Sequence, residues 1–103
     1  MTAREATLQR FDDLLGMVFL DNTEDEAMRL WRYRVQMAPD TARAELEAFE
    51  AVLTDPPDDF DEVLAARGGI HLAHVSPEAI TPFSAAERDE WLRALVARMR
   101  AEL

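Results

Sequence analysis

The chain has 103 residues and a formal net charge of −10, and its 11 Lys and Arg positions are all arginine. It contains no cysteine, which excludes disulfides and thiolate metal sites. No stretch approaches the roughly 20 consecutive apolar residues that a membrane-spanning helix needs. A strongly acidic chain of this length is expected to fold as a single helical domain, residues 1–103, and to avoid nucleic acid and anionic membranes.

Apolar side chains near the beginning of the chain recur at helical spacing and predict a first helix over residues 4–19. Gly16 lies inside this segment, where glycine costs about 1 kcal/mol relative to alanine, so we expect a kink or a close helix contact there. A second helix is predicted to begin at the capping box Thr23-Glu24-Asp25-Glu26 and to stop at Pro39. Its predicted apolar stripe consists of Ala27, Leu30, Trp31, Arg34, Val35 and Ala38.

The middle of the chain predicts two further helices. Asp40 is the expected N-cap of a third helix, which ends at Asp55-Pro56-Pro57. A short fourth helix is expected to be capped by Asp59 together with Glu62 and to end at Gly68-Gly69, a pair suited to a left-handed helix end. The third helix has a regular apolar face, made of Ala42, Leu46, Phe49, Val52 and Leu53.

An irregular segment precedes the longest apolar stripe of the chain. Residues 70–83 contain two prolines and show no sustained period, so we expect an ordered loop over the core. Ser84 then opens a capping box for a C-terminal helix. These segments predict an all-α fold: a single compact domain of about five helices in a roughly antiparallel bundle. The stripe of the last helix consists of Arg88, Trp91, Leu92, Leu95, Val96, Met99 and Leu103.

Negative charge is concentrated in two runs, one before the second helix and one around the fourth. A fixed acidic patch on a folded scaffold attracts basic surfaces, so both runs are candidate partner-binding surfaces. Their acids have an alternative role as helix caps and solubilising charge. Phe60 is either the first core residue of the fourth helix or an aromatic anchor ringed by carboxylates. The candidate partner-binding residues are Asp21, Glu24, Asp25, Asp58, Asp59, Phe60, Asp61 and Glu62.

The sequence predicts no catalytic residue, metal site or cofactor. His71, His74 and Glu78 are of metal-ligating types, but the glycines before them and the proline beside them oppose the helical spacing at which they would converge. Ser84 is explained as a cap and Ser76 precedes a proline, so neither serine lies in a nucleophile elbow. No glycine-rich phosphate loop is present. The histidines are therefore expected to be ordinary loop residues.

One enzyme class stays open as an alternative, an all-helical metal-carboxylate hydrolase of nucleotides. Its carboxylates would come from Glu47 and Glu50 on the third helix and from Glu87 and Glu90 on the last. The apolar face of the third helix places Glu47 on the solvent side, and Glu87 has a capping role, so a protein without enzymatic activity is favoured. Both tryptophans lie on apolar stripes and are expected to pack in the core rather than to anchor a partner.

A pattern of five segments runs through most of the chain. In order they are Leu14-Leu15-Gly16-Met17-Val18-Phe19-Leu20-Asp21, Thr23-Glu24-Asp25-Glu26-Ala27, Ala44-Glu45-Leu46-Glu47, the short acidic helix from Phe60-Asp61-Glu62-Val63-Leu64 to Gly68, and Trp91-Leu92. This pattern resembles the immunity proteins of contact-dependent growth inhibition systems, a family of small helical bacterial proteins. That family often has a His-Gln-Asp stretch after the phenylalanine, where this chain has Leu20-Asp21-Asn22.

The resemblance implies a cytoplasmic protein that binds and neutralises a cognate toxin domain, often a nuclease, and that needs no cofactor. A nuclease presents a basic groove to phosphates, and an acidic protein can cover that groove and associate with it rapidly. The acidic candidate residues would then form the contact with the toxin. The alternative from another class is an acidic helical adaptor or regulatory domain with an unrelated protein partner.

Overall fold

Helices make up all the regular structure of the residues that this computed structural model describes, which are 2–67 and 85–103. The predicted all-α fold class is confirmed. Within these two ranges, no helix combines the length and the apolar character needed to cross a membrane. The elements are α1 (Ala3–Leu14), the π-helical turn η1 (Leu15–Phe19), α2 (Glu24–Met37), α3 (Pro39–Thr54), α4 (Phe60–Arg67) and α6 (Ala85–Arg100).

Several of the sequence predictions fall on residues outside the described ranges. The loop expected at residues 70–83 is one of them, and the glycine pair and the Ser84 cap on either side of it are others. The same is true of His71, His74, Ser76 and Glu78. These predictions therefore stay predictions.

The predicted first helix is divided into α1 and the turn η1. α1 begins after Thr2, whose Oγ1 accepts a hydrogen bond from the backbone N of Glu5 at 3.1 Å. The wider turn ends where the backbone N of Leu20 donates to the carbonyl of Leu15 at 2.9 Å, five residues earlier. Gly16 lies inside η1, so the irregularity expected at this glycine takes the form of a π turn.

α2 passes into α3 through a single residue, Ala38. The beginning of α2 is as predicted, because the Oγ1 of Thr23 accepts a hydrogen bond from the backbone N of Glu26 at 3.2 Å. The expected N-cap role of Asp40 is wrong: α3 begins at Pro39, with Ala38 in the cap position and no side-chain cap. Proline suits the first helical position, because its fixed φ is helical and it has no N–H to leave unpaired.

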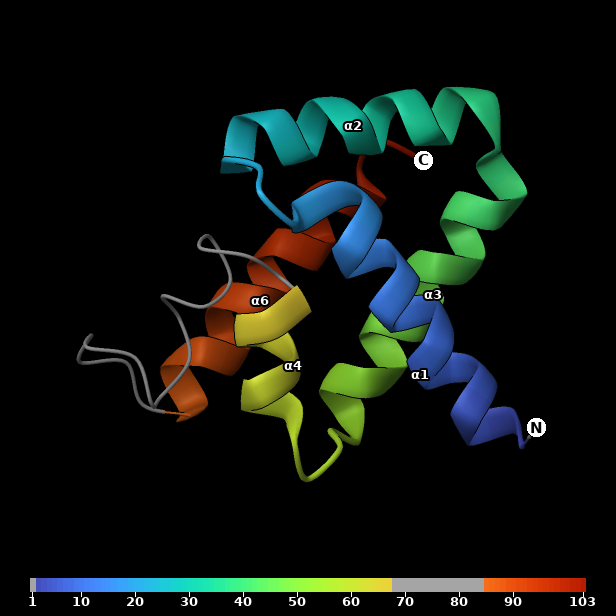
Figure 1. Cartoon of the computed structure of the whole chain (residues 1–103). Helices are drawn as coiled ribbons and strands as arrows, with labels where there is room; N and C mark the ends of the chain where they lie inside the picture. Colours follow the sequence, from blue (N-terminus) through green and yellow to red (C-terminus); the bar gives the residue numbers. More distant parts are fainter. Residues whose placement is uncertain (1, 68–84) are drawn as a thin grey trace.

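α3 packs against α1, α2 and α6, and in Figure 1 α2 crosses the upper ends of the other long helices. A buried hydrogen bond joins α2 to the end of α6: the Nε1 of Trp31 donates to the carbonyl of Met99 at 2.8 Å. An ion pair between Arg98 and Glu24 reinforces this junction. Trp31 is fully buried, which confirms its expected core position.

One cluster of buried side chains joins all the described helices. On α2 the pattern differs from the prediction, since Met28 is buried while Leu30, expected in the core, is 40% exposed. Trp91 is half-buried and packs against the cluster. The cluster consists of Phe11, Leu14, Leu15, Val18, Phe19, Ala27, Met28, Trp31, Ala42, Leu46, Phe49, Val52, Leu53, Phe60, Leu64, Leu92, Leu95, Val96 and Met99.

Candidate binding surface

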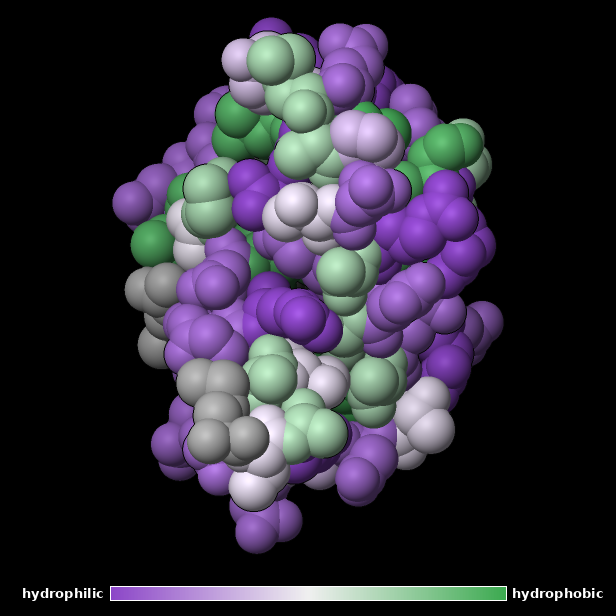
Figure 2. All heavy atoms as spheres, turned by 90° about the vertical axis from the view of Figure 1, so that its right-hand side faces the viewer, coloured by the Kyte–Doolittle hydropathy of each residue, from purple (hydrophilic) through white to green (hydrophobic). Residues whose placement is uncertain are grey.

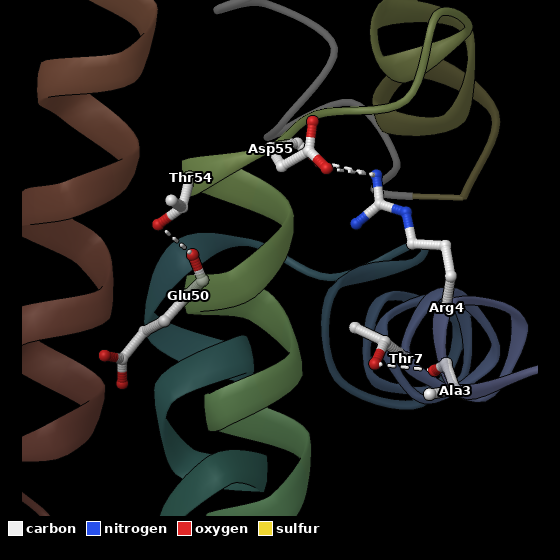
Figure 3. Close-up of polar contacts among 6 residues, drawn as sticks. All are labelled: Ala3, Arg4, Thr7, Glu50, Thr54 and Asp55. Carbon is white, nitrogen blue, oxygen red and sulfur yellow. Dashed lines mark hydrogen bonds and ion pairs between the residues drawn. The ribbon is translucent and has the colours of Figure 1, made fainter.

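The second acidic run begins in the connection between α3 and α4. Asp55 ends α3, and Arg4 reaches from α1 to its carbonyl and to its carboxylate, at 4.0 Å for the latter (Figure 3). Asp58 and Asp59 are exposed, and so is Glu62 in the first turn of α4. Among residues 2–67 and 85–103, no ion pair engages these three carboxylates. They are therefore available to a partner.

Phe60, in the middle of this run, is a core residue. It is 4% exposed, its ring lies 6.0 Å from that of Phe11, and the guanidinium carbon of Arg88 lies 5.0 Å from its centroid. The expectation that Phe60 anchors a partner is therefore corrected, and the core alternative is confirmed. The physical reason is that α4 is short and needs its first-turn aromatic to attach it to the core. Asp61 follows in α4, but its side chain lies outside the described part of the chain.

A hollow of about 400 Å³ lies between α1 and α4, beside the acidic run. Leu8 and Phe11 of α1 and Val63 of α4 give it an apolar lining. Carboxylates also line it, including those of the exposed Glu5 and Asp59. The structure therefore adds an apolar recess to the charge that the sequence predicts.

Sequence reasoning missed the α1 side of this hollow. Glu5 and Asp12 lie far from the acidic run along the chain, and each reads on its own as a surface residue of a helix. They reach the run because α1 packs along α3, and Arg4 fastens the start of α1 to the end of α3. The available signal was the position of Leu8 on the apolar stripe, which requires the first turns of α1 to contact another element.

The first acidic run is largely used inside the fold. Glu24 forms an ion pair with Arg98 of α6, and Glu26 belongs to the cap at Thr23. Asp21 has a φ of 63°, in the left-handed region, where it turns the chain between η1 and α2. Asp25 is exposed. Most acids of this run therefore act as caps or structural charges, which was the alternative to partner binding.

The two runs do not merge into one patch. In Figure 1 the start of α2, with Glu24 and Asp25, lies at the top of the molecule, and the connection that carries Asp58 and Asp59 lies at the bottom. A partner that covers both has to span the molecule. The structure therefore favours the run around α4 as the more accessible acidic surface.

A second kind of surface lies over η1 and α2, and sequence reasoning did not predict it. Met17, Leu30, Tyr33 and Met37 are 40% to 67% exposed and line a hollow of about 250 Å³. Four exposed apolar residues around one hollow are typical of a surface that contacts other molecules. Hydrophilic residues cover most of the side on which α2 passes into α3, with hydrophobic ones between them (Figure 2).

A partly buried ion pair lies beside this apolar surface. Glu45 is 3% exposed, and its Oε1 accepts a hydrogen bond from the Nε of Arg34 at 2.7 Å. Both residues line a further hollow of about 370 Å³. The pair fixes α2 against α3 close to their junction, because each side chain is held by a charged partner on the other helix.

The carboxylates of the alternative hydrolase do not gather in the described structure. Glu50 forms an ion pair with Arg100, whereas Glu47 and Glu90 are exposed. No group of three or more His, Cys, Asp or Glu within residues 2–67 and 85–103 is placed to hold a metal ion. No observation here favours this alternative.

Comparison with protein-family models, with curated proteins and with solved structures found no match. The resemblance to contact-dependent growth inhibition immunity proteins therefore stays a prediction from the sequence. The surface offers exposed carboxylates, one apolar-lined recess among them, and a separate apolar patch.

Proposed function

We propose that this chain binds and neutralises a basic protein domain, as an immunity protein does with its cognate toxin. The observation that carries the proposal is the exposure of Asp58, Asp59 and Glu62 on a helical scaffold, without an ion pair to other described residues. A carboxylate without an ion pair can contact a partner without first breaking a contact of the fold, whereas Glu24 would have to leave Arg98.

The electrostatics supports a basic partner. The net charge of −10 attracts cationic surfaces over distances of about 10 Å at moderate salt. A nuclease-type toxin needs a basic groove for phosphates, and an acidic protein can compete for that groove at association rates up to about 10⁸–10⁹ M⁻¹s⁻¹ in low salt. Partners with a mismatched charge pattern would be excluded by repulsion between like charges.

The second candidate function is that of an adaptor for an unrelated protein partner. It is favoured by the apolar patch of Met17, Leu30, Tyr33 and Met37, because methionine and tyrosine are frequent in interfaces. The two functions differ in their salt dependence. Binding through the acids weakens steeply with salt, and binding through the apolar patch does not.

The decisive test begins with the product of any neighbouring gene that encodes a large secreted toxin. Its association rate with the unmodified chain is compared with that of a triple variant, Asp58→Lys, Asp59→Asn and Glu62→Lys. Asparagine retains the capping role that the sequence predicts for residue 59. We expect the rate constant at low salt to fall by about 10-fold or more, since charge steering controls association.

A matched control separates local contact from net charge. Glu47→Lys, Glu90→Lys and Asp40→Asn change the net charge by the same amount at exposed positions outside both acidic runs. This control is expected to stay within about three-fold of the unmodified rate. An unchanged rate in the first variant, or an equal loss in both, would refute the proposed surface. Circular dichroism of each variant verifies that the fold is intact.

A further inference from the structure

We infer that the hollow between α1 and α4 is a socket for an arginine side chain of the partner. This inference rests on the proposed function and deepens it, because it assigns the chemistry of one partner residue. The hollow measures about 400 Å³, opens to the surface beside the exposed acids, and combines an apolar floor with a charged rim.

The floor suits the stem of a long cationic side chain. Leu8 and Val63 are half-buried, and their exposed parts form an apolar strip between two helices above the buried Phe11. Arginine and lysine bury their methylene stems on such surfaces while the charged head stays at the edge. A short acidic or polar side chain would gain nothing from this strip.

The rim suits the charged head. Glu5 on α1 and Asp59 before α4 are both exposed, and both line the hollow. Among the described residues that line it, none is basic. The other hollows described here differ in this respect, since Arg34 lines the two beside α2 and Arg93 and Arg100 line one between α3 and α6.

The chain itself binds guanidinium groups on both sides of this connection. Arg4 contacts Asp55 at the end of α3, and Arg88 lies over the ring of Phe60 at the start of α4. These contacts show that a carboxylate and an aromatic face at this junction accept arginine. Arginine is preferred over lysine because its planar head can donate to two carboxylates at once and is less strongly hydrated.

The walls of the socket are already in place in the free chain. The ring of Phe11 packs 5.2 Å from that of Phe49 and 6.0 Å from that of Phe60, which fixes α1 against both α3 and α4. A preformed recess avoids the ordering cost that weakens binding to mobile surfaces. Binding of an arginine should therefore not require rearrangement of the helices.

The test is a ¹⁵N–¹H NMR titration of the chain with the peptide acetyl-Gly-Arg-Gly-amide. We expect saturable shifts at the amides of Leu8, Asp12 and Val63, with a dissociation constant on the order of millimolar, as suits one side chain. The same peptide with citrulline, which keeps the shape and removes the charge, should cause no shift there. The lysine peptide should bind at least about three-fold more weakly.

Two variants locate the site. Glu5→Gln with Asp59→Asn should weaken the arginine peptide by about five-fold or more, and the matched pair Glu47→Gln with Glu90→Gln should leave it within about two-fold. Shifts spread equally over all acidic segments, or equal losses in both double variants, would overturn the socket. Equal binding of the citrulline peptide would overturn it as well.

The outcomes distinguish the socket from the proposed function. A toxin that binds through Asp58 and Glu62 while the arginine peptide leaves the α1 and α4 amides unmoved refutes the socket alone. An arginine peptide that occupies the socket, in a chain that no basic toxin recognises, supports the socket and refutes the proposed function.

Discussion

The acids before α2 and the acids around α4 differ in what their carboxylates contact. Glu24 forms an ion pair with Arg98, and Glu26 accepts a hydrogen bond from the hydroxyl of Thr23. Asp21 has a structural role through its backbone, which forms a left-handed turn. Asp58 and Glu62 are exposed and make no ion pair with another described residue. Although the two runs are similar in composition, most acids before α2 stabilise the fold, whereas Asp58 and Glu62 around α4 stay exposed at the surface.

The difference follows from what lies opposite each run. The start of α2 faces the C-terminal end of α6, which carries Arg98 as well as the Met99 carbonyl that binds Trp31. The connection before α4 faces the first turns of α1, whose nearest cation, Arg4, is used on Asp55. Among the described residues, acids stay exposed and without an ion pair where the fold provides no cation for them. The density of charge along the sequence does not show which acids have a cation opposite them in the fold.

The largest expected change in the free energy of unfolding is at Phe60, which is a core residue although acids surround it in the sequence. Phe60→Ala should lower the free energy of unfolding by about 3 kcal/mol, because it opens a cavity beside Phe11 and removes the ring under Arg88. Phe60→Leu, which keeps most of the volume, should cost about 1 kcal/mol. Urea unfolding measures both. A loss below about 1 kcal/mol for the alanine variant would contradict the core role.

The second prediction concerns the backbone of the first run. Asp21 has a φ of 63°, which a β-branched residue adopts at a cost of about 1–2 kcal/mol. Asp21→Val should therefore destabilise the chain by roughly that amount, and Asp21→Gly should not destabilise it at all. Thermal unfolding of the pair measures the difference. Equal stability of the two variants would show that Asp21 acts through its charge and not through the turn.

Much of the fold could be predicted from the sequence because its signals are local. The cap at Thr23, the stop at Pro39 and the apolar face of α3 each depend on residues a few positions apart. Gly16 was the only residue whose type indicated an irregularity at the π turn. The apolar residues around it gave no indication, because they fit a continuous α-helix as well as a π turn. The N-cap prediction for Asp40 was wrong because the helix begins one residue earlier, at Pro39, whose fixed φ suits the first helical position.

The buried face of α2 was harder to predict because it depends on its neighbours. Met28 lies one turn before Trp31 on the same side of the helix, whereas Leu30 lies on another side, so the packing of Trp31 against α6 covers Met28 and leaves Leu30 exposed. Glu45 is buried only because Arg34 arrives from the preceding helix. Likewise, the sequence supplied the acids of the α4 run but not the α1 wall of the hollow, which exists only after α1 and α4 pack together.

The third prediction measures how much the first run contributes to the fold. A double-mutant cycle with Glu24→Gln and Arg98→Gln should give a coupling of about 0.2–1 kcal/mol, because both side chains are partly exposed. The coupling should shrink in high salt. The same cycle with Asp25, which is exposed and one residue further on, should give a coupling near zero. A larger coupling for Asp25 would mean that Glu24 is not the acid that holds α6.

The smallest expected change in the free energy of unfolding comes from removing acids around α4, compared with removing acids before α2. Asp58→Asn with Glu62→Gln should leave the free energy of unfolding unchanged or raise it by up to about 0.5 kcal/mol, because it relieves repulsion in a chain of charge −10. Glu24→Gln with Asp25→Asn removes the same charge and should lower it, since the ion pair with Arg98 is lost. Chemical denaturation at low salt compares the two pairs. If the first pair destabilises as much as the second, the acids around α4 also stabilise the fold and are not free for a partner.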